Sequence, residues 1–131
     1  MRPALILEDG SFLQRAGVST DAAPSSKFRT SVALDLYYKT LAAKQPEAKE
    51  SHRTDWELRK YVWNHTFVNE LYREPHEHPV LLIDPWVSDD IVGCHSEASQ
   101  VMFESFEVPA LHIANAAYCS YLGALHSPLS L

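Results

Sequence analysis

No apolar run in this sequence approaches the ~20 residues that a helix needs to cross a bilayer. The apolar residues after Met1 are interrupted by Glu8 and Asp9, which leaves them too short for the hydrophobic region of a secretory signal. Basic residues are also scarce, because 11 Lys and Arg stand against 17 Asp and Glu. The resulting net charge of −6 disfavours binding to the phosphate backbone of nucleic acids. We therefore expect other proteins as partners, with neither nucleic acid nor membrane among them.

Cysteine is rare as well. The two cysteines, Cys94 and Cys119, lie in different predicted elements and form no Cys-x-x-Cys pair, so a zinc knuckle is not expected. Two free thiols are typical of a reducing compartment, which favours a cytoplasmic protein. The 131 residues, 46% of them hydrophobic and 21% charged, are enough for one globular domain.

The first part of the sequence predicts three strands and one helix. Short apolar segments at 4–7 and 12–18 flank a turn at 8–11 and are typical of a β-hairpin. Alternation over 27–32 predicts a third strand at an edge of the sheet. Good helix formers then predict a helix over 33–45, which ends because the next residue is a proline.

Helices and strands alternate in the rest of the sequence. A capping box at Thr54–Glu57 opens the clearest helix, over 55–73. The elements predicted after it are a strand at 80–83, a helix from about Ser96, a strand at 108–113 and a helix at 115–122. Three antiparallel strands followed by two crossover units predict an α/β fold with the ribonuclease H-like order βββαβαβα. That order has a mixed five-stranded sheet with flanking helices.

Four sequence blocks, in the correct order, resemble actin and the actin-related proteins. They are the hairpin region Ala4–Ser11 with Arg15–Gly17 and Asp21–Pro24, the segment Trp63–Leu71, the run Glu77–Leu82 and the segment Gln100–Ala110. The resemblance implies the first subdomain of that family, as one domain over residues 1–131. Residues 33–53 have no convincing match, and we expect a divergent insert there in place of the family's small second subdomain.

The resemblance also implies where a nucleotide would bind. In this family two hairpins close on a phosphate chain through their backbone amides. The part of this sequence that matches the first hairpin consists of Glu8, Asp9, Gly10, Ser11, Phe12, Leu13 and Arg15. Phe12 stands where the family has a glycine, and its benzyl group is expected to obstruct a phosphate or force the loop open. Arg15 stands where the family has a phosphate-contacting lysine, with the same charge but a different geometry.

The resemblance places the acidic and catalytic positions too. Glu8 stands at the family's acidic position near the metal, and Asp84 at the strand end that carries a second acidic residue, which makes both weak metal candidates. Ala116 occupies the place of the glutamine that positions the attacking water, and alanine cannot orient water. We therefore expect no catalysis and neither ATP nor Mg²⁺ as cofactor. A distant alternative is a metal-dependent nuclease of ribonuclease H-like fold, which would need further carboxylates and a basic approach.

Four tyrosines are candidates for an interface with other proteins. Tyr37 and Tyr38 lie in the divergent segment, where they either face a partner or pack on their own domain. Tyr61 is offset from the apolar stripe of its helix, and Tyr121 lies on the last helix, which faces a second lobe in the family.

The function implied by these features is structural. We expect a non-catalytic, truncated actin-like subunit that serves as a scaffold in a larger cytoskeletal assembly in the cytoplasm. Ciliary or flagellar axonemes, dynein-associated complexes and chromatin-remodelling complexes all use subunits of this family, and the sequence does not decide among them. The alternative is an N-terminal fragment of a nucleotide-binding actin-related protein.

Overall fold

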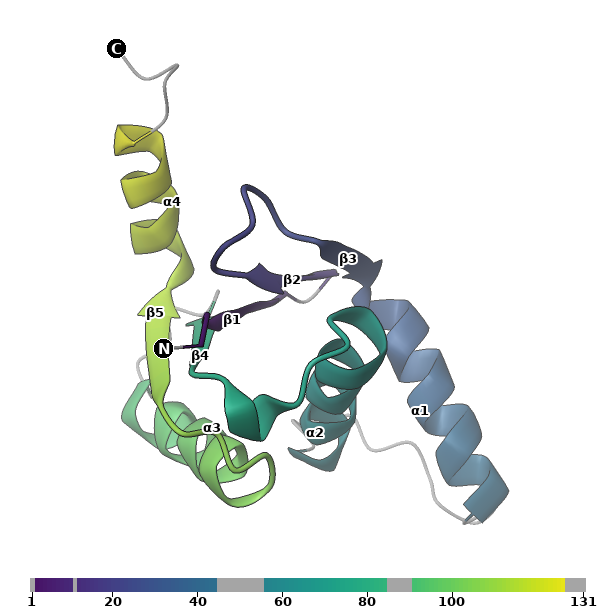
Figure 1. Ribbon diagram of the computed structural model, residues 1–131. Helices are drawn as coiled ribbons and strands as arrows, with labels where there is room; N and C mark the ends of the chain where they lie inside the picture. Colours follow the sequence, from purple (N-terminus) through teal and green to yellow (C-terminus); the bar gives the residue numbers. More distant parts are fainter. Residues whose placement is uncertain (1, 11, 45–55, 85–90, 127–131) are drawn as a thin grey trace.

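The computed structural model describes residues 2–10, 12–44, 56–84 and 91–126 (Figure 1). Its strands are β1 (Leu5–Asp9), β2 (Leu13–Val18), β3 (Ser26–Arg29), β4 (Val80–Asp84) and β5 (Leu111–Asn115). Its helices are α1 (Thr30–Lys44), α2 (Trp56–His65), α3 (Ile91–Glu104) and α4 (Ala116–Leu125). A π-helical turn, η1 (Thr66–Glu70), and a 3₁₀ turn, η2 (Pro75–Glu77), join α2 to β4. None of the helices in the described residues is both long and apolar enough to cross a membrane.

The strands form one mixed sheet in the order β3-β2-β1-β4-β5. β1, β2 and β3 pair antiparallel, whereas β4 pairs parallel with β1 and with β5. This order confirms the predicted ribonuclease H-like α/β fold, because each parallel strand is reached through a helical crossover.

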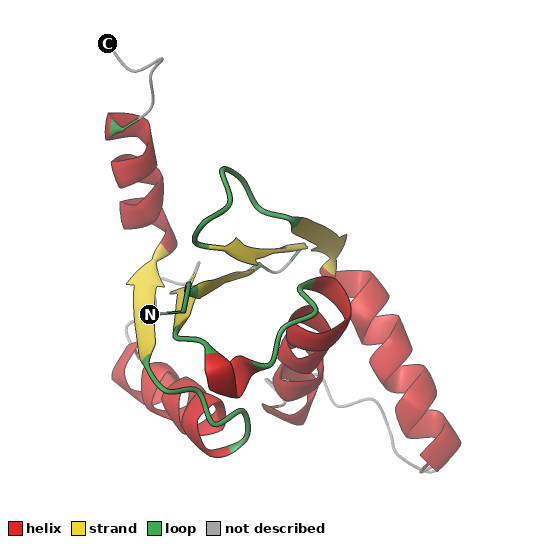
Figure 2. Cartoon of the chain, in the orientation of Figure 1, coloured by secondary structure: helices red, strands yellow, loops and turns green. Residues whose placement is uncertain are grey.

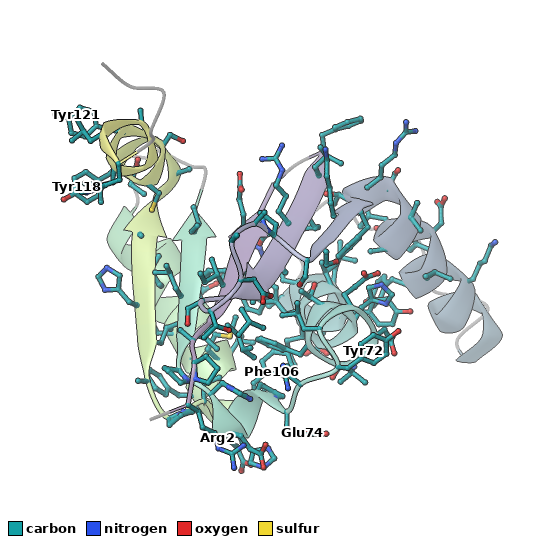
Figure 3. The ribbon with its side chains drawn as sticks, turned by 45° about the horizontal axis from the view of Figure 1, so that its top comes forward. Arg2, Tyr72, Glu74, Phe106, Tyr118 and Tyr121 are labelled. Carbon is teal, nitrogen blue, oxygen red and sulfur yellow. The ribbon has the colours of Figure 1, made fainter. Side chains whose placement is uncertain are left out.

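The hydrophobic core lies between one face of the sheet and the helices α2 and α3, which Figure 2 shows on the same side of the strands. Alternate residues of the central strands point into it, among them Leu5 and Leu82. From the helical side, Phe67 and Met102 are completely buried. The ring of Phe106, labelled in Figure 3, packs edge-on against Phe67 at a centroid distance of 5.2 Å.

The boundary between the third strand and the first helix differs from the sequence prediction. The strand ends at Arg29 and α1 begins at Thr30, so the predicted strand over 27–32 is too long and the helix begins three residues before position 33. The cause lies elsewhere in the chain, because the Thr30 backbone N–H donates to the Phe12 carbonyl at 2.9 Å. This bond fixes the start of α1 against the β1–β2 hairpin.

The long helix predicted over 55–73 is interrupted. α2 ends at His65 and passes into η1, in which the Leu71 N–H bonds the Thr66 carbonyl at 2.9 Å, five residues back. The Thr66 hydroxyl donates to the Val62 carbonyl at 2.8 Å. The capping box at Thr54–Glu57 lies partly outside the described residues.

The bounds of the last three elements also differ from the prediction. α3 begins at Ile91, before the predicted start near Ser96. The last strand spans Leu111–Asn115 instead of 108–113, because the Val108 N–H bonds the Met102 carbonyl at 3.3 Å and so turns back towards the last turn of α3. The last helix accordingly runs to Leu125.

Candidate functional site

One buried side chain, that of Gln14, connects the hairpin between β1 and β2 to the start of α1. The Gln14 amide nitrogen Nε2 lies 2.8 Å from Asp9 Oδ1 and 2.9 Å from the Gly10 carbonyl. It also lies 3.2 Å from Thr30 Oγ1, whose hydroxyl donates to the Gly10 carbonyl at 2.8 Å. A Cβ on Gly10 would lie 2.2 Å from the Leu13 carbonyl oxygen, so only glycine fits this turn. The hairpin is therefore held by hydrogen bonds within the chain.

An ion pair also connects the hairpin to α2. Asp9 Oδ2 lies 3.2 Å from Arg59 Nη2, and the two side chains are only 15% and 25% exposed. The guanidinium lies over the rings of Trp56 and Trp63, at 5.0 and 5.8 Å from their centroids. Asp9 thus faces an internal cation on the helical side of the sheet.

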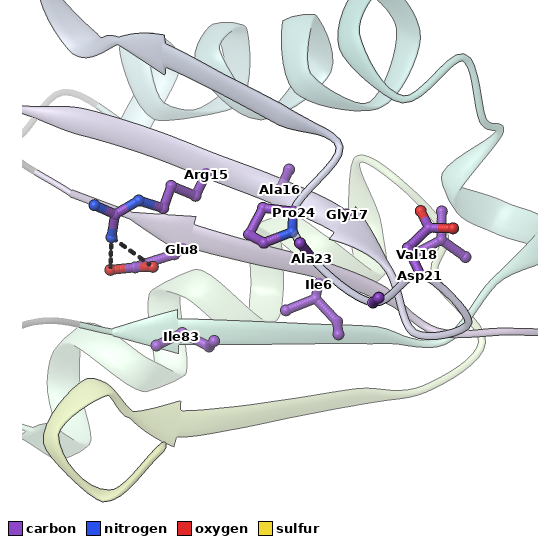
Figure 4. Close-up of a pocket in the computed structure, with 11 residues that line it drawn as sticks. Ile6, Glu8, Arg15, Ala16, Gly17, Val18, Asp21, Ala23, Pro24 and Ile83 are labelled. Atoms are coloured by element: carbon purple, nitrogen blue, oxygen red, sulfur yellow. Dashed lines mark hydrogen bonds and ion pairs between the residues drawn. The ribbon is translucent and has the colours of Figure 1, made fainter. Parts of the chain in front are cut away.

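Glu8 and Arg15 lie on the opposite face of the sheet and face each other across the β1–β2 pair. Arg15 Nη1 is 3.4 Å from both carboxylate oxygens of Glu8 (Figure 4). They stand at one end of a half-open cavity of about 240 Å³, whose apolar lining includes Ile6, Pro24 and Ile83. The acidic side chain at the expected metal position and the cation at the expected phosphate position therefore neutralise one another.

Phe12 lies at the tip of the hairpin with its side chain 64% exposed. The Arg29 guanidinium lies 5.7 Å from the centre of the Phe12 ring, and the Phe12 carbonyl accepts the N–H of Thr30. Leu13 is half-buried at the start of β2, and Ser11 lies outside the described residues. The expected obstruction of a phosphate by Phe12 stays a prediction.

The two weak metal candidates lie on the neighbouring strands β1 and β4. Glu8 is the register partner of Ile83, so Asp84 follows one residue further, at the end of β4; its side chain lies outside what the structure describes. Within the described ranges, no three His, Cys, Asp or Glu residues are grouped so that they could hold a metal ion. Ala116 begins α4, behind an N-cap in which Asn115 Oδ1 accepts the N–H of Ala117 at 2.8 Å.

The four tyrosines chosen from the sequence occupy two separate places. Tyr37 on α1 packs against Tyr38 and against Tyr61 of α2, with centroid distances of 5.4 Å for both pairs. These three rings therefore mark the contact between α1 and α2. Tyr121 is 60% exposed on α4, beside Tyr118 at 59% (Figure 3).

Sequence reasoning missed several residues of this site. Gln14, Thr30 and Arg59 make the contacts that hold the hairpin, yet their partners are four to fifty residues away along the chain. The sequence does carry a signal for Arg59, because this basic residue lies at helical spacing from both Trp56 and Trp63. Tyr118 was missed although it precedes Tyr121 by three residues on the same helix, a spacing that places both on one side.

Comparisons with known proteins agree with the fold. The family model described as "Actin" matches residues 1–127. "Actin-related protein 4" of Oryza sativa, in both subsp. indica and subsp. japonica, is 38% identical over 74 residues. That match covers 56% of this chain and 16% of each relative, so the chain corresponds to a small part of those proteins.

Proposed function

This chain belongs to the actin family, and from that premise we propose that it is a non-catalytic structural subunit that binds other proteins in a larger assembly. Its place is the cytoplasm and the cytoskeleton, with axonemal and dynein-associated assemblies as the specific settings to examine first. The proposal rests on how the hairpin residues are used.

The observation that carries the proposal is the pairing of Glu8 with Arg15. A phosphate approaching this hairpin would compete with an existing carboxylate for the Arg15 guanidinium, and a metal would compete with that cation for Glu8. Asp9 is likewise paired, with Arg59. Charged groups that recognise phosphate and metal elsewhere in the family are here satisfied by one another, which supports a role without nucleotide.

Two substitutions support the same conclusion. Phe12 brings a large ring to the hairpin tip, where the family has glycine. Ala116 removes the side chain that would orient water for hydrolysis. Together they argue against ATP turnover, even if a nucleotide were to bind weakly.

Calorimetric titration of the purified chain with ATP, in the presence of Mg²⁺, tests this proposal. We expect no saturable heat, because Arg15 and Arg59 are already paired with the hairpin carboxylates of Glu8 and Asp9. A dissociation constant at or below about 1 μM would overturn it, because such affinity corresponds to roughly −8 kcal/mol of specific contacts. Nucleotide extracted from the natively purified protein in stoichiometric amount would contradict it equally, and would favour a nucleotide-binding actin-related protein.

A further inference from the structure

β3 forms one edge of the sheet. It spans Ser26–Arg29 and pairs antiparallel with β2, and among the described elements no other strand pairs with it. Figure 1 shows it at the margin of the sheet, where α1 begins. The outer side of an edge strand carries backbone N–H and C=O groups to which a further strand can bond.

The register of the ladder shows which residues of β3 offer these groups. The Thr30 N–H bonds the Phe12 carbonyl at 2.9 Å, which makes these two residues a hydrogen-bonded pair of the antiparallel ladder. Bonded and non-bonded pairs alternate along such a ladder, so the residues two and four positions before Thr30 bond β2. The backbone groups of Lys27 and Arg29 therefore point outwards, and no other described residue bonds them.

The side chains at this edge are basic, although the chain as a whole carries a net charge of −6. Lys27 and Arg29 are exposed and lie on the same face of the sheet as Arg15. Lys27 stands directly opposite Arg15, and two like charges in that position repel. The carboxylate of Glu8 lies on the far side of Arg15, and Asp21 lies at the other end of the cavity (Figure 4). Among the described residues neither Lys27 nor Arg29 forms an ion pair, so the edge keeps uncompensated positive charge.

Side chains on the helical side hold this edge in position. The Ser26 hydroxyl donates to Glu70 Oε2 at 2.7 Å, and Glu70 Oε1 lies 3.2 Å from His65 Nε2. The ring of Phe28 meets the His65 ring edge-on at a centroid distance of 5.2 Å. Thr30 fixes the other end of the strand through its bonds to the hairpin. Because β3 is already ordered, little further ordering of this strand opposes the binding of a partner.

We propose that β3 is a docking edge for an extended acidic segment of a partner protein, which adds to the sheet as a further strand. The added strand bonds the outward backbone groups of Lys27 and Arg29 and places its carboxylates beside their side chains. Its residues alternate between the two faces, so those between the acidic ones lie on the side of Phe28 and are small or apolar. This partner is one for the structural subunit proposed above, and the inference therefore rests on that function.

Charged residues on a short edge strand also protect it from aggregation. The two roles are compatible, because cations that repel a basic strand, or the same edge of a second copy, attract an acidic strand. Docking differs from protection alone in one measurable way. It requires saturable binding that depends both on the charge and on the backbone of β3.

Fluorescence anisotropy tests the docking edge with the full 131-residue chain and a labelled peptide of about seven residues that alternates glutamate with valine. We expect saturable binding with a dissociation constant of about 10 to about 100 μM at low salt, weaker at high salt. The same peptide with lysine in place of glutamate should not bind. Two further peptides carry N-methyl groups on alternate amides, along one edge or the other. One of them should lose binding, because its methylated edge faces β3, and the other should bind within about threefold of the parent.

Two substitutions of Lys27 separate the effect of its charge from that of its backbone. Lys27→Gln removes the charge and keeps the N–H, whereas Lys27→Pro removes both. Because this N–H points away from β2, the proline leaves the ladder intact. We expect Lys27→Gln to raise the dissociation constant about threefold and Lys27→Pro at least about tenfold further. The matched control is Lys39→Gln, at an exposed lysine on α1, which should bind like the wild type. Urea denaturation verifies the fold of each variant.

Amide hydrogen exchange, measured by NMR, locates the site on the unmodified chain. Saturating glutamate peptide should slow the exchange of the Lys27 and Arg29 amide protons at least about tenfold and leave the exchange of α4 unchanged. If Lys27→Pro does not fold, this measurement decides in its place.

Four results would overturn the docking edge: no saturable binding of the glutamate peptide, equal binding of the lysine peptide, equal losses for folded Lys27→Gln and Lys27→Pro, or unchanged exchange at Lys27 and Arg29. The third result would mean that a basic patch binds acidic peptides by charge alone. None of them affects the proposed non-catalytic role, which the ATP titration decides separately. Conversely, ATP binding would reject that role and leave the peptide result readable.

Discussion

Replacing Arg59 by methionine tests whether the hairpin is held by charge from α2. Methionine keeps most of the length and apolar contact of the side chain but removes the guanidinium. Asp9 Oδ2 is buried and has no hydrogen-bond donor among the described residues even with Arg59 present, so the substitution leaves it without its charged partner, while Oδ1 keeps the Gln14 amide. The variant therefore measures what the cation contributes to the hairpin's attachment.

The magnitude follows from the geometry. Losing a charged partner at 3.2 Å costs about 1.5–3 kcal/mol. Losing the contacts with the Trp56 and Trp63 rings adds roughly 0.5–1 kcal/mol. Residual solvent access at Asp9 and Arg59 keeps the total below the ~3–5 kcal/mol of a fully buried broken pair. We expect a loss of about 2–3 kcal/mol in the free energy of unfolding, or a melting temperature lower by roughly 7–11 °C in a chain of this size.

Urea denaturation followed by tryptophan fluorescence supplies the measurement. The control is Lys60→Met, because Lys60 is the neighbouring basic residue on α2 and pairs only with the exposed Glu57 at 3.3 Å in the contacts described here. That variant should cost less than about 0.5 kcal/mol. A double-mutant cycle with Asp9→Asn should give a coupling of at least about 1 kcal/mol. Equal losses for Arg59→Met and Lys60→Met, or a coupling near zero, would refute the reasoning.

Three further predictions concern the turn, the α1–α2 contact and assembly. Gly10→Ala should destabilise the chain by at least about 2 kcal/mol, whereas Gly123→Ala, whose Cβ meets nothing within 4 Å, should be neutral or stabilising in the same urea titration. Tyr37→Glu combined with Tyr38→Glu should loosen the packing of α1 on α2 and lower the midpoint of urea denaturation, because Tyr37 packs against Tyr61 of α2; an unchanged midpoint would mean that this contact adds nothing to stability. In polymerising salt the chain should stay in the supernatant after high-speed sedimentation, because residues 33–53 have no convincing match to the small second subdomain of the family; an ordered filament in the pellet would contradict this.

The order of elements could be predicted because it follows from local patterns. The continuous apolar run at Val80–Ile83 is typical of a strand in the middle of a sheet, and β4 lies between β1 and β5. The short apolar segment that forms β1 and the turn residues after it indicate the hairpin. In each case the information lies within a few neighbouring residues.

The misplaced boundaries depend on contacts that are distant in sequence. Thr30 begins a helix because its backbone and hydroxyl bond Phe12 and Gly10, about twenty residues earlier, whereas its local sequence favours a strand. Leu71 closes a π-helical turn because its N–H reaches Thr66, and no periodicity distinguishes that from an α-helical turn. The role of Arg59 could not be predicted for the same reason, because its partner Asp9 lies far away in sequence, on the first strand.

The two faces of the first strand explain why this hairpin can be rigid without a ligand. Alternation places Asp9 on the helical side, against Arg59, and Glu8 on the other side, against Arg15. A hairpin that recognises phosphate needs donors left unsatisfied in the protein alone, and that need lowers its stability until the ligand binds. Here each carboxylate has a cation from the chain itself, and the Gly10 carbonyl accepts from Gln14 and Thr30. We therefore expect the hairpin to keep its conformation without a nucleotide, as the proposed structural role requires.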